Sequence, residues 1–326
     1  MKISISFLVF FIFVFIPFQP AAANQRPLII ATGTGALCGP VVIAQEKGFF
    51  RDQGLKTATT SLKTEKLAFR AYEKGGADAV VHSSIHIVRS NFDVSGHVVI
   101  GTIAYSDNQM RLLARKSAGI TKVSDLKGKK IALPRAGFAH FFLEKFLLFN
   151  GLTLDDVDEV FVGKKQIPDT IGKGLAHATI HHGIPIAETK KILGEDYVMF
   201  QNPAIHRKTN QLLVSREWVE NNRGQAKGIL RAIIKAEKFI KTHTEESSKI
   251  LVKAKRYDVN DMARTVRQEI DFYLSLKPSV FTELEGIEQW ALANNIVARK
   301  TPRNYFDMVD SSLLEEVDPR RVTIIR

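Results

Sequence analysis

DLKGKKIALPRAGFAHFF, residues 125–142, joins a basic turn, a short apolar strand and the start of a phenylalanine-rich helix. The pattern predicts a strand at KKIALP and a helix that continues to Asn150. Gly151 then ends this helix, because glycine tolerates the left-handed conformation just past a helix end. A short apolar strand that passes directly into a helix is typical of parallel βαβ units. The stretch therefore predicts an α/β fold.

The same alternation extends in both directions and predicts two α/β lobes. PLIIATG, LKTATTSL, DAVVH and HVVIGTIAY are predicted strands of a first lobe, whereas QMRLLARK, KKIALP, DEVFVG, HATIHH and DYVMFQ are predicted strands of a second. After QLLVS, nearly everything from Glu217 to Leu276 is predicted to be helical, with one more helix from about Thr282 to Asn295. Because no low-complexity linker separates the halves, we expect strands to cross directly between the lobes, around a ligand cleft. The expected boundaries are 27–105 plus 214–326 for lobe 1 and 106–213 for lobe 2.

The N-terminus predicts export. One lysine, an apolar run from about Ile5 to Phe18 and three alanines before Asn24 are typical of a secretory signal peptide, residues 1–23. The alternative is a retained membrane anchor, but the run is shorter than a membrane span and lacks a basic flank. The single cysteine of the chain excludes an internal disulfide, so the core must supply the stability. We therefore expect a periplasmic protein.

The composition and net charge limit the classes of partner that the protein can have. The chain has 326 residues, 45% of them hydrophobic and 25% charged, which excludes a disordered protein. A net charge of +12 is compatible with nucleic acid or an anionic membrane, but export removes most nucleic-acid partners. The remaining interpretation of this charge is a positive electrostatic field that attracts small anions. Basic residues at helical spacing opposite Ile229, Ile233 and Ile240 predict an amphipathic helix within 223–267, with either a solvated face or a membrane-complex contact.

Motifs for catalysis and metal binding are weak. The glycine cluster Gly33–Gly39 has Cys38 where a dinucleotide fingerprint needs its third glycine, and no acidic residue follows the next strand. A plain strand-to-helix turn facing a cleft is favoured over nucleotide binding, and a packed Cys38 over a nucleophile. The histidines His82 and His86, and the cluster 177–182, favour surface or cleft-lining positions over a metal site.

The chain resembles a known family at several motifs in the right order. ITKVSDLKGKKIALPRAGFAHFFLEKFLLFNGLTLDDVDEVFV (residues 120–162), GPVVIAQEKGFFRDQGLKT (39–57), KGGADAVV (74–81) and MVDSSLLEEVDP (308–319) are similar to periplasmic solute-binding proteins of ABC transporters. That family serves nitrate, taurine and alkanesulfonates and includes the thiamine-precursor (NMT1/THI5-like) proteins. The resemblance implies a type II periplasmic binding protein fold whose two lobes are joined by crossing strands near 105–109 and 212–215.

The resemblance also implies a ligand site at the ends of strands, where open parallel sheets bind ligands. A helix that begins near Phe138 would direct the positive end of its dipole at an anionic group, and Arg135 would either add a bidentate contact or point to solvent. His140 would line the cleft, cap the helix or pack. The expected ligand-binding residues are Gly35, Cys38, Gly39, Ser83, Ser84, Tyr105, Arg135, Ala136, Gly137, Phe138, His140 and His182.

Two departures from the family affect the ligand. Ala136-Gly137-Phe138 replaces small hydroxyl residues, which weakens the case for a sulfonate and favours an apolar or aromatic ligand body. HHGIP, residues 181–185, stands where many members have an acidic Glu-Pro.

The function expected from the resemblance is capture of a small anionic organic solute by a monomer. It would deliver the solute to a permease and its ATPase, with no catalysis, cofactor or metal. The alternatives are a ligand-sensing or scaffold protein that docks on another membrane partner, and an enzyme like the thiamine-pyrimidine synthases. One cysteine argues against the iron site of those enzymes.

Overall fold

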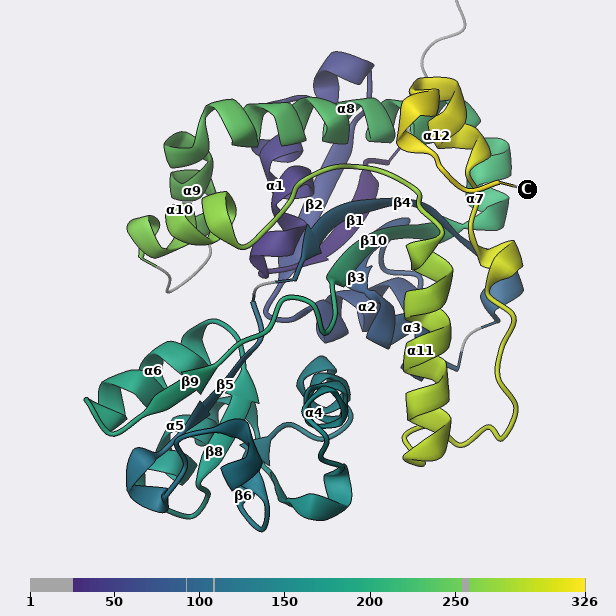
Figure 1. Cartoon of the computed structure of the whole chain (residues 1–326). Coiled ribbons are helices and arrows are strands. Elements are labelled where there is room, and N and C mark those ends of the chain that lie inside the picture. Colours follow the sequence, from purple (N-terminus) through teal and green to yellow (C-terminus); the bar gives the residue numbers. More distant parts are fainter. Residues whose placement is uncertain (1–25, 92, 108, 254–257, 326) are drawn as a thin grey trace, which may run out of the picture.

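Two five-stranded mixed sheets form the centres of two lobes in the computed structural model, which describes residues 26–91, 93–107, 109–253 and 258–325 (Figure 1). The first sheet has the order β2-β1-β3-β10-β4, and the second has the order β7-β6-β8-β5-β9. The strands are β1 Leu28–Gly33, β2 Thr57–Leu62, β3 Ala79–Ser83, β4 His97–Ser106, β5 Arg111–Ala114, β6 Lys130–Leu133, β7 Asp158–Phe161, β8 Ala178–His181, β9 Val198–Phe200 and β10 Lys208–Ser215.

Each sheet is parallel at one end and antiparallel at the other. β1 pairs in parallel with β2 and β3, and β6 does so with β7 and β8. β10 is antiparallel to both β3 and β4, and β5 is antiparallel to both β8 and β9. Central β3 is buried along its whole length, whereas β2 forms an edge whose residues are all exposed or half-buried. The α/β class and the two lobes are thereby confirmed.

Helices cover both sheets. Lobe 1 carries α1 Gly39–Glu46, α2 Glu65–Glu73, α3 Ser84–Arg89, α7 Arg216–Asn221, α8 Arg223–Thr242, α9 Thr244–Val252, α10 Val259–Gln268, α11 Ser279–Ala293 and α12 Ser312–Val317, and lobe 2 carries α4 Phe138–Phe149, α5 Ile167–Gly172 and α6 Ile184–Leu193. α8 is the amphipathic helix that the sequence predicts, because Ile229, Ile233 and Ile240 are buried. Part of its basic face is paired: Lys227 contacts Glu316, and Lys235 contacts Asp52.

The chain crosses between the lobes twice. The first crossing joins β4 to β5, as expected, but the return joins β9 to β10 at residues 201–207. The sequence prediction placed this return at 212–215 and the lobe boundary at 213, yet β10 lies between β3 and β4 in the first sheet. An apolar strand fits either sheet, so its pattern does not reveal which sheet it joins.

The helical prediction for 217–276 is wrong at its end. Residues 271–276 run extended beside β4, where Asp271 exchanges backbone hydrogen bonds with Tyr105 and Ser275 does so with Thr102. This segment brings the end of α10 to the first crossing. The expected signal peptide, residues 1–23, lies outside the described residues. Among the helices that the structure describes, none is long and apolar enough to cross a membrane.

The lobes also contact each other through α4 and α11 (Figure 1). Trp290 of α11 packs against His140 and Phe141 of α4, with ring centroids 5.2 and 5.6 Å apart. The Asn294 amide donates a 2.9 Å hydrogen bond to the carboxylate of Glu144 on α4. One side of the space between the lobes is therefore filled.

Candidate ligand-binding site

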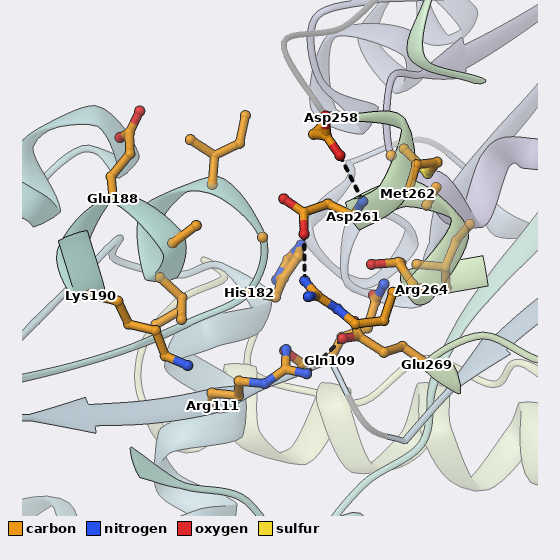
Figure 2. Close-up of a pocket in the computed structure, with 18 of the residues that line it drawn as sticks. Gln109, Arg111, His182, Glu188, Lys190, Asp258, Asp261, Met262, Arg264 and Glu269 are labelled. Atoms are coloured by element: carbon orange, nitrogen blue, oxygen red, sulfur yellow. Dashed lines mark hydrogen bonds and ion pairs between the residues drawn. The ribbon is translucent and has the colours of Figure 1, made fainter. Parts of the chain in front are cut away.

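A cavity of about 550 Å³ lies between the two lobes (Figure 2). Lobe 1 contributes the turn Gly35–Leu37, the first residue of α2 and the inner face of α10. Lobe 2 contributes the start of β5, the first turns of α6 and the end of β9. Because both lobes form its wall, a molecule held there would contact both at once.

The start of α6 forms one wall. β8 ends at His181, and Gly183 turns the chain with a φ of 64° that favours glycine. Pro185 has no N–H group, and the amides of Ile186 and Ala187 donate to the Gly183 carbonyl. Ile184, the first residue of the helix, lines the cavity, so that the positive end of the helix dipole lies at this wall.

An ion pair between the lobes forms the floor. The Arg111 guanidinium at the start of β5 donates to the Glu269 carboxylate at 2.7 Å, and the two side chains are 18% and 12% exposed. Arg111 also donates to the Gln109 carbonyl, and the Ser106 hydroxyl donates to the Glu269 carbonyl. Figure 2 shows this pair below His182. The pair fixes the end of α10 to the first crossing.

Most other charges of the wall are also compensated. Arg264 pairs with Asp261 on α10 at 2.8 Å, and Asp258 caps the same helix by accepting two backbone N–H groups. On α6, Glu188 and Lys190 bring opposite charges, and the Lys190 ammonium lies over the Tyr197 ring. The wall is therefore close to neutral as a whole, with acidic groups gathered on α10.

Two polar atoms at the cavity have no partner among the described residues. They are Oε1 of Gln109, whose side chain is buried, and Nδ1 of His182. Burial, followed by the neighbouring His181, Lys208, Lys164 and Arg111, lowers the pKa of His182 well below its ordinary value. A neutral His182 can donate or accept a hydrogen bond. Both atoms are buried within the wall, so each residue lines the cavity while this polar atom points away from solvent.

The inner end of the cavity is formed by Glu65 and Lys208. The Lys208 ammonium lies 3.8 Å from the Glu65 carboxylate, which accepts a 3.1 Å hydrogen bond from the Asn210 amide. Burial alone would raise the pKa of Glu65, but Lys208, His86 and Asn210 outweigh it and lower this pKa to about 2. Glu65 is therefore ionised. Burial lowers the pKa of His86 to about 3, so that its imidazole is neutral.

The structure brings only some of the residues predicted for the ligand site to the cavity. Gly35 and His182 are on its wall. Within the described residues, Cys38, Gly39, Ser83, Ser84 and Tyr105 are buried behind that wall. Cys38 receives the Asn210 amide at 3.7 Å, Ser84 accepts from Gln211, and the Tyr105 hydroxyl bonds to Ser275.

The expected corner at residues 135–140 is also outside the described wall of the cavity. Arg135 is exposed, with its guanidinium 5.4 Å from the centre of the Phe161 ring, and Ala136 adopts a positive φ of 58° beside Gly137, the N-cap of α4. His140 accepts from the Ala136 amide and lies 2.8 Å from Glu159. Phe138 is buried at the start of α4.

Several residues of the cavity were missed by the sequence analysis. These are Glu65, Gln109, Arg111, Lys208 and Glu269, which come from four separate parts of the chain. One local signal was available: Gln109 and Arg111 alternate at the start of an apolar strand, which puts both on one face. The other residues meet only through the crossings.

Solved structures of binding proteins share this fold. The periplasmic aliphatic sulphonate binding protein SsuA from Escherichia coli aligns with a TM-score of 0.74 and 16% identity, over 86% of this chain and 94% of its own. The alkanesulfonate-binding protein SsuA from Xanthomonas axonopodis pv. citri, bound to MOPS, gives 0.70 and 16% over 89% and 100%.

An enzyme also shares the fold. The desulfurization enzyme DSZB aligns with a TM-score of 0.66 and 12% identity, over 91% of this chain and 99% of its own. At these identities the likeness establishes the type II periplasmic binding protein fold. No curated protein matches the chain significantly by sequence.

A family model supplies the stronger evidence. The model described as "NMT1/THI5 like" matches residues 38–247, which is more than half of the chain and includes the stretch 125–142. The match begins at Cys38, before α1, and runs through both crossings into α9. The chain belongs to the NMT1/THI5-like family.

Proposed function

We propose that this chain is the substrate-binding protein of a periplasmic ABC importer. It captures a small organic solute that carries an acidic group, such as a sulfonate or carboxylate on an aliphatic or aromatic body, and delivers it to a membrane permease and its ATPase. It acts as an exported monomer. Family membership and the shared fold support this proposal.

One observation carries the proposal: the cavity is walled by both lobes, next to the two crossings. A solute held there contributes contacts to both lobes at once, so its binding favours the closed arrangement over an open one. The start of α6, Lys190, Lys208 and the neutral His182 line the cavity and provide groups for an acidic solute. Apolar wall residues such as Met199 and Ile186 suit its organic body.

The arrangement of the only thiol supports binding rather than catalysis. Cys38 is fully buried beneath Asn210 and is not among the described residues of the cavity wall. A thiol that acts as a nucleophile needs access to substrate and a lowered pKa. The fold is nevertheless compatible with enzymes, as DSZB shows. Conversion of a bound solute by the purified protein would replace the transport proposal with a catalytic one.

The first test is native mass spectrometry of the freshly purified protein, which is expected to retain a small acidic molecule. The second is a thermal-shift panel of sulfonates, carboxylates, nitrate and pyrimidines. A solute at a hundredfold excess over its dissociation constant stabilises the folded state by about 2.7 kcal/mol, which such a panel detects. A protein that retains no molecule and is stabilised by no compound in the panel would refute the proposal. Neighbouring genes for a permease and an ATPase favour transport, whereas a membrane kinase gene favours sensing.

A further inference from the structure

Lys208 presents a buried ammonium group at the inner end of the cavity. Its side chain is 8% exposed, and it is the first residue of β10, directly after the second crossing. Its nearest acidic atom is Oε1 of Glu65, 3.8 Å away, which is beyond the 2.7–3.2 Å or so of a good hydrogen bond. Within the described part of the chain, the Lys208 ammonium donates no side-chain hydrogen bond.

The surroundings compensate this ammonium only in part. The centre of the Phe138 ring lies 5.6 Å from Nζ, which gives a cation–π contact. Glu65 divides its interactions among Lys208, the Asn210 amide and the His86 ring, whose Nε2 lies 4.0 Å away. The Lys208 side chain is only 8% exposed, so its ammonium has few water contacts, and an acceptor that arrives from the cavity adds a charge-assisted hydrogen bond.

The local field at this end of the cavity favours negative charge. The depressed pKa of Glu65 shows that Lys208 and its neighbours stabilise a carboxylate there despite the burial. Arg111 is different, because its guanidinium is already paired with Glu269 at 2.7 Å and also bonded to the Gln109 carbonyl. An anionic group therefore meets an available donor at Lys208 and an occupied one at Arg111.

We propose that Lys208 is the residue that receives the acidic group of the solute, and that Glu65 is its internal competitor. This inference rests on the solute-binding function proposed above and assigns the anion position within that site. The solute enters with its acidic group inward, toward the turn before α1, and its body lies between α6 and α10. Since Glu65 remains beside the ammonium, it lowers the affinity for every anion.

The decisive comparison keeps the buried charge balanced. Glu65→Gln removes the competitor, and the double variant Glu65→Gln/Lys208→Met removes the ammonium as well without leaving an unpaired buried carboxylate. The probes are methanesulfonate and acetate, together with whichever panel compound stabilises the unmodified protein, all followed by calorimetry. We expect Glu65→Gln to bind them at least as tightly as the unmodified protein. The double variant should lose about 30-fold or more relative to Glu65→Gln, as is typical when one partner of a buried charged contact is removed.

Lys191→Met is the matched control, because Lys191 is an exposed lysine of α6 outside the described wall of the cavity. It should change affinity less than about threefold, the range of an exposed charge. Equal affinity of Glu65→Gln and the double variant would overturn the assignment of Lys208 while leaving the transport function intact. Lack of binding by the unmodified protein to any compound would refute the function itself. If the double variant unfolds, Lys208→Arg is the test instead. Its guanidinium keeps the charge but shifts its position, so the affinity for the probes should fall. An unchanged affinity would count against the proposal.

Discussion

Replacement of Arg111 by methionine is expected to destabilise the folded protein by about 2–3 kcal/mol. The substitution keeps most of the apolar stem but leaves the Glu269 carboxylate, 12% exposed, without its partner. Removal of one member of a buried pair costs about 3–5 kcal/mol, and we expect a cost at or just below the bottom of this range because water reaches both groups through the cavity. Glu269→Gln should cost less, about 1 kcal/mol, because the amide oxygen still accepts from Arg111.

The double variant Arg111→Met/Glu269→Gln makes this prediction sharp. With both charges gone, no unpaired carboxylate remains, so the double variant should be more stable than Arg111→Met alone. Urea unfolding followed by circular dichroism gives the four free energies of unfolding and hence a coupling energy of about 1–2 kcal/mol. If the costs of the two single substitutions sum to the cost of the double variant within about 0.5 kcal/mol, the two side chains do not stabilise each other and the reasoning fails.

Three further predictions concern Glu65, a histidine and two glycines. The pKa of Glu65 falls from 4.5 to about 2 on folding, so its stabilisation is present above pH 4.5 and is lost as the pH falls toward 2. Up to about 3 kcal/mol is at stake, and Glu65→Gln should flatten the acid limb of unfolding in that window. Burial lowers the pKa of His82 to about 4, so the unfolded state gains protons first as the pH falls from 6.5. His82→Gln should therefore reduce the loss of melting temperature between pH 6.5 and 4. Gly33→Ala places a Cβ 2.7 Å from the Cγ and backbone nitrogen of Glu65 and should cost about 1–3 kcal/mol in urea unfolding. Its control, Gly286→Ala in α11, meets nothing within 4 Å and should stabilise by about 0.5–1 kcal/mol.

The local pattern was sufficient for most elements and for the fold. KKIALP becomes β6, and the phenylalanine-rich run becomes α4 and ends at Phe149, because burial periodicity and the glycine at 151 are both local signals. The extended segment 271–276 was predicted helical, because its structure comes from pairing with β4, which its own sequence does not encode. The sequence also placed the second crossing too late in the chain, because the pairing of β10 with β3 and β4 is not encoded in its own sequence.

The site was harder to predict than the fold. Arg135 follows a strand, as a ligand contact would, yet it lies over Phe161 on the outside. Glu65 begins a helix and Lys208 begins a strand, and from the sequence each residue alone is predicted to be an ordinary surface charge. Only the second crossing brings these two residues together. Glu65 packs closely against the backbone of Gly33, which has no Cβ. When distant parts of the chain come together to bury a charged residue, the local composition around that residue does not reveal the burial.

The contact between α4 and α11 gives the protein a built-in optical reporter. The chain has two tryptophans, and Trp290, 3% exposed, lies in lobe 1 with its indole against His140 and Phe141 of lobe 2. Any rotation of one lobe relative to the other changes the polarity around this indole and therefore its emission wavelength. Trp218, on α7 of lobe 1, can be replaced by phenylalanine to leave a single emitter. Lobe motion then becomes measurable by intrinsic fluorescence, without a dye and before any solute is known.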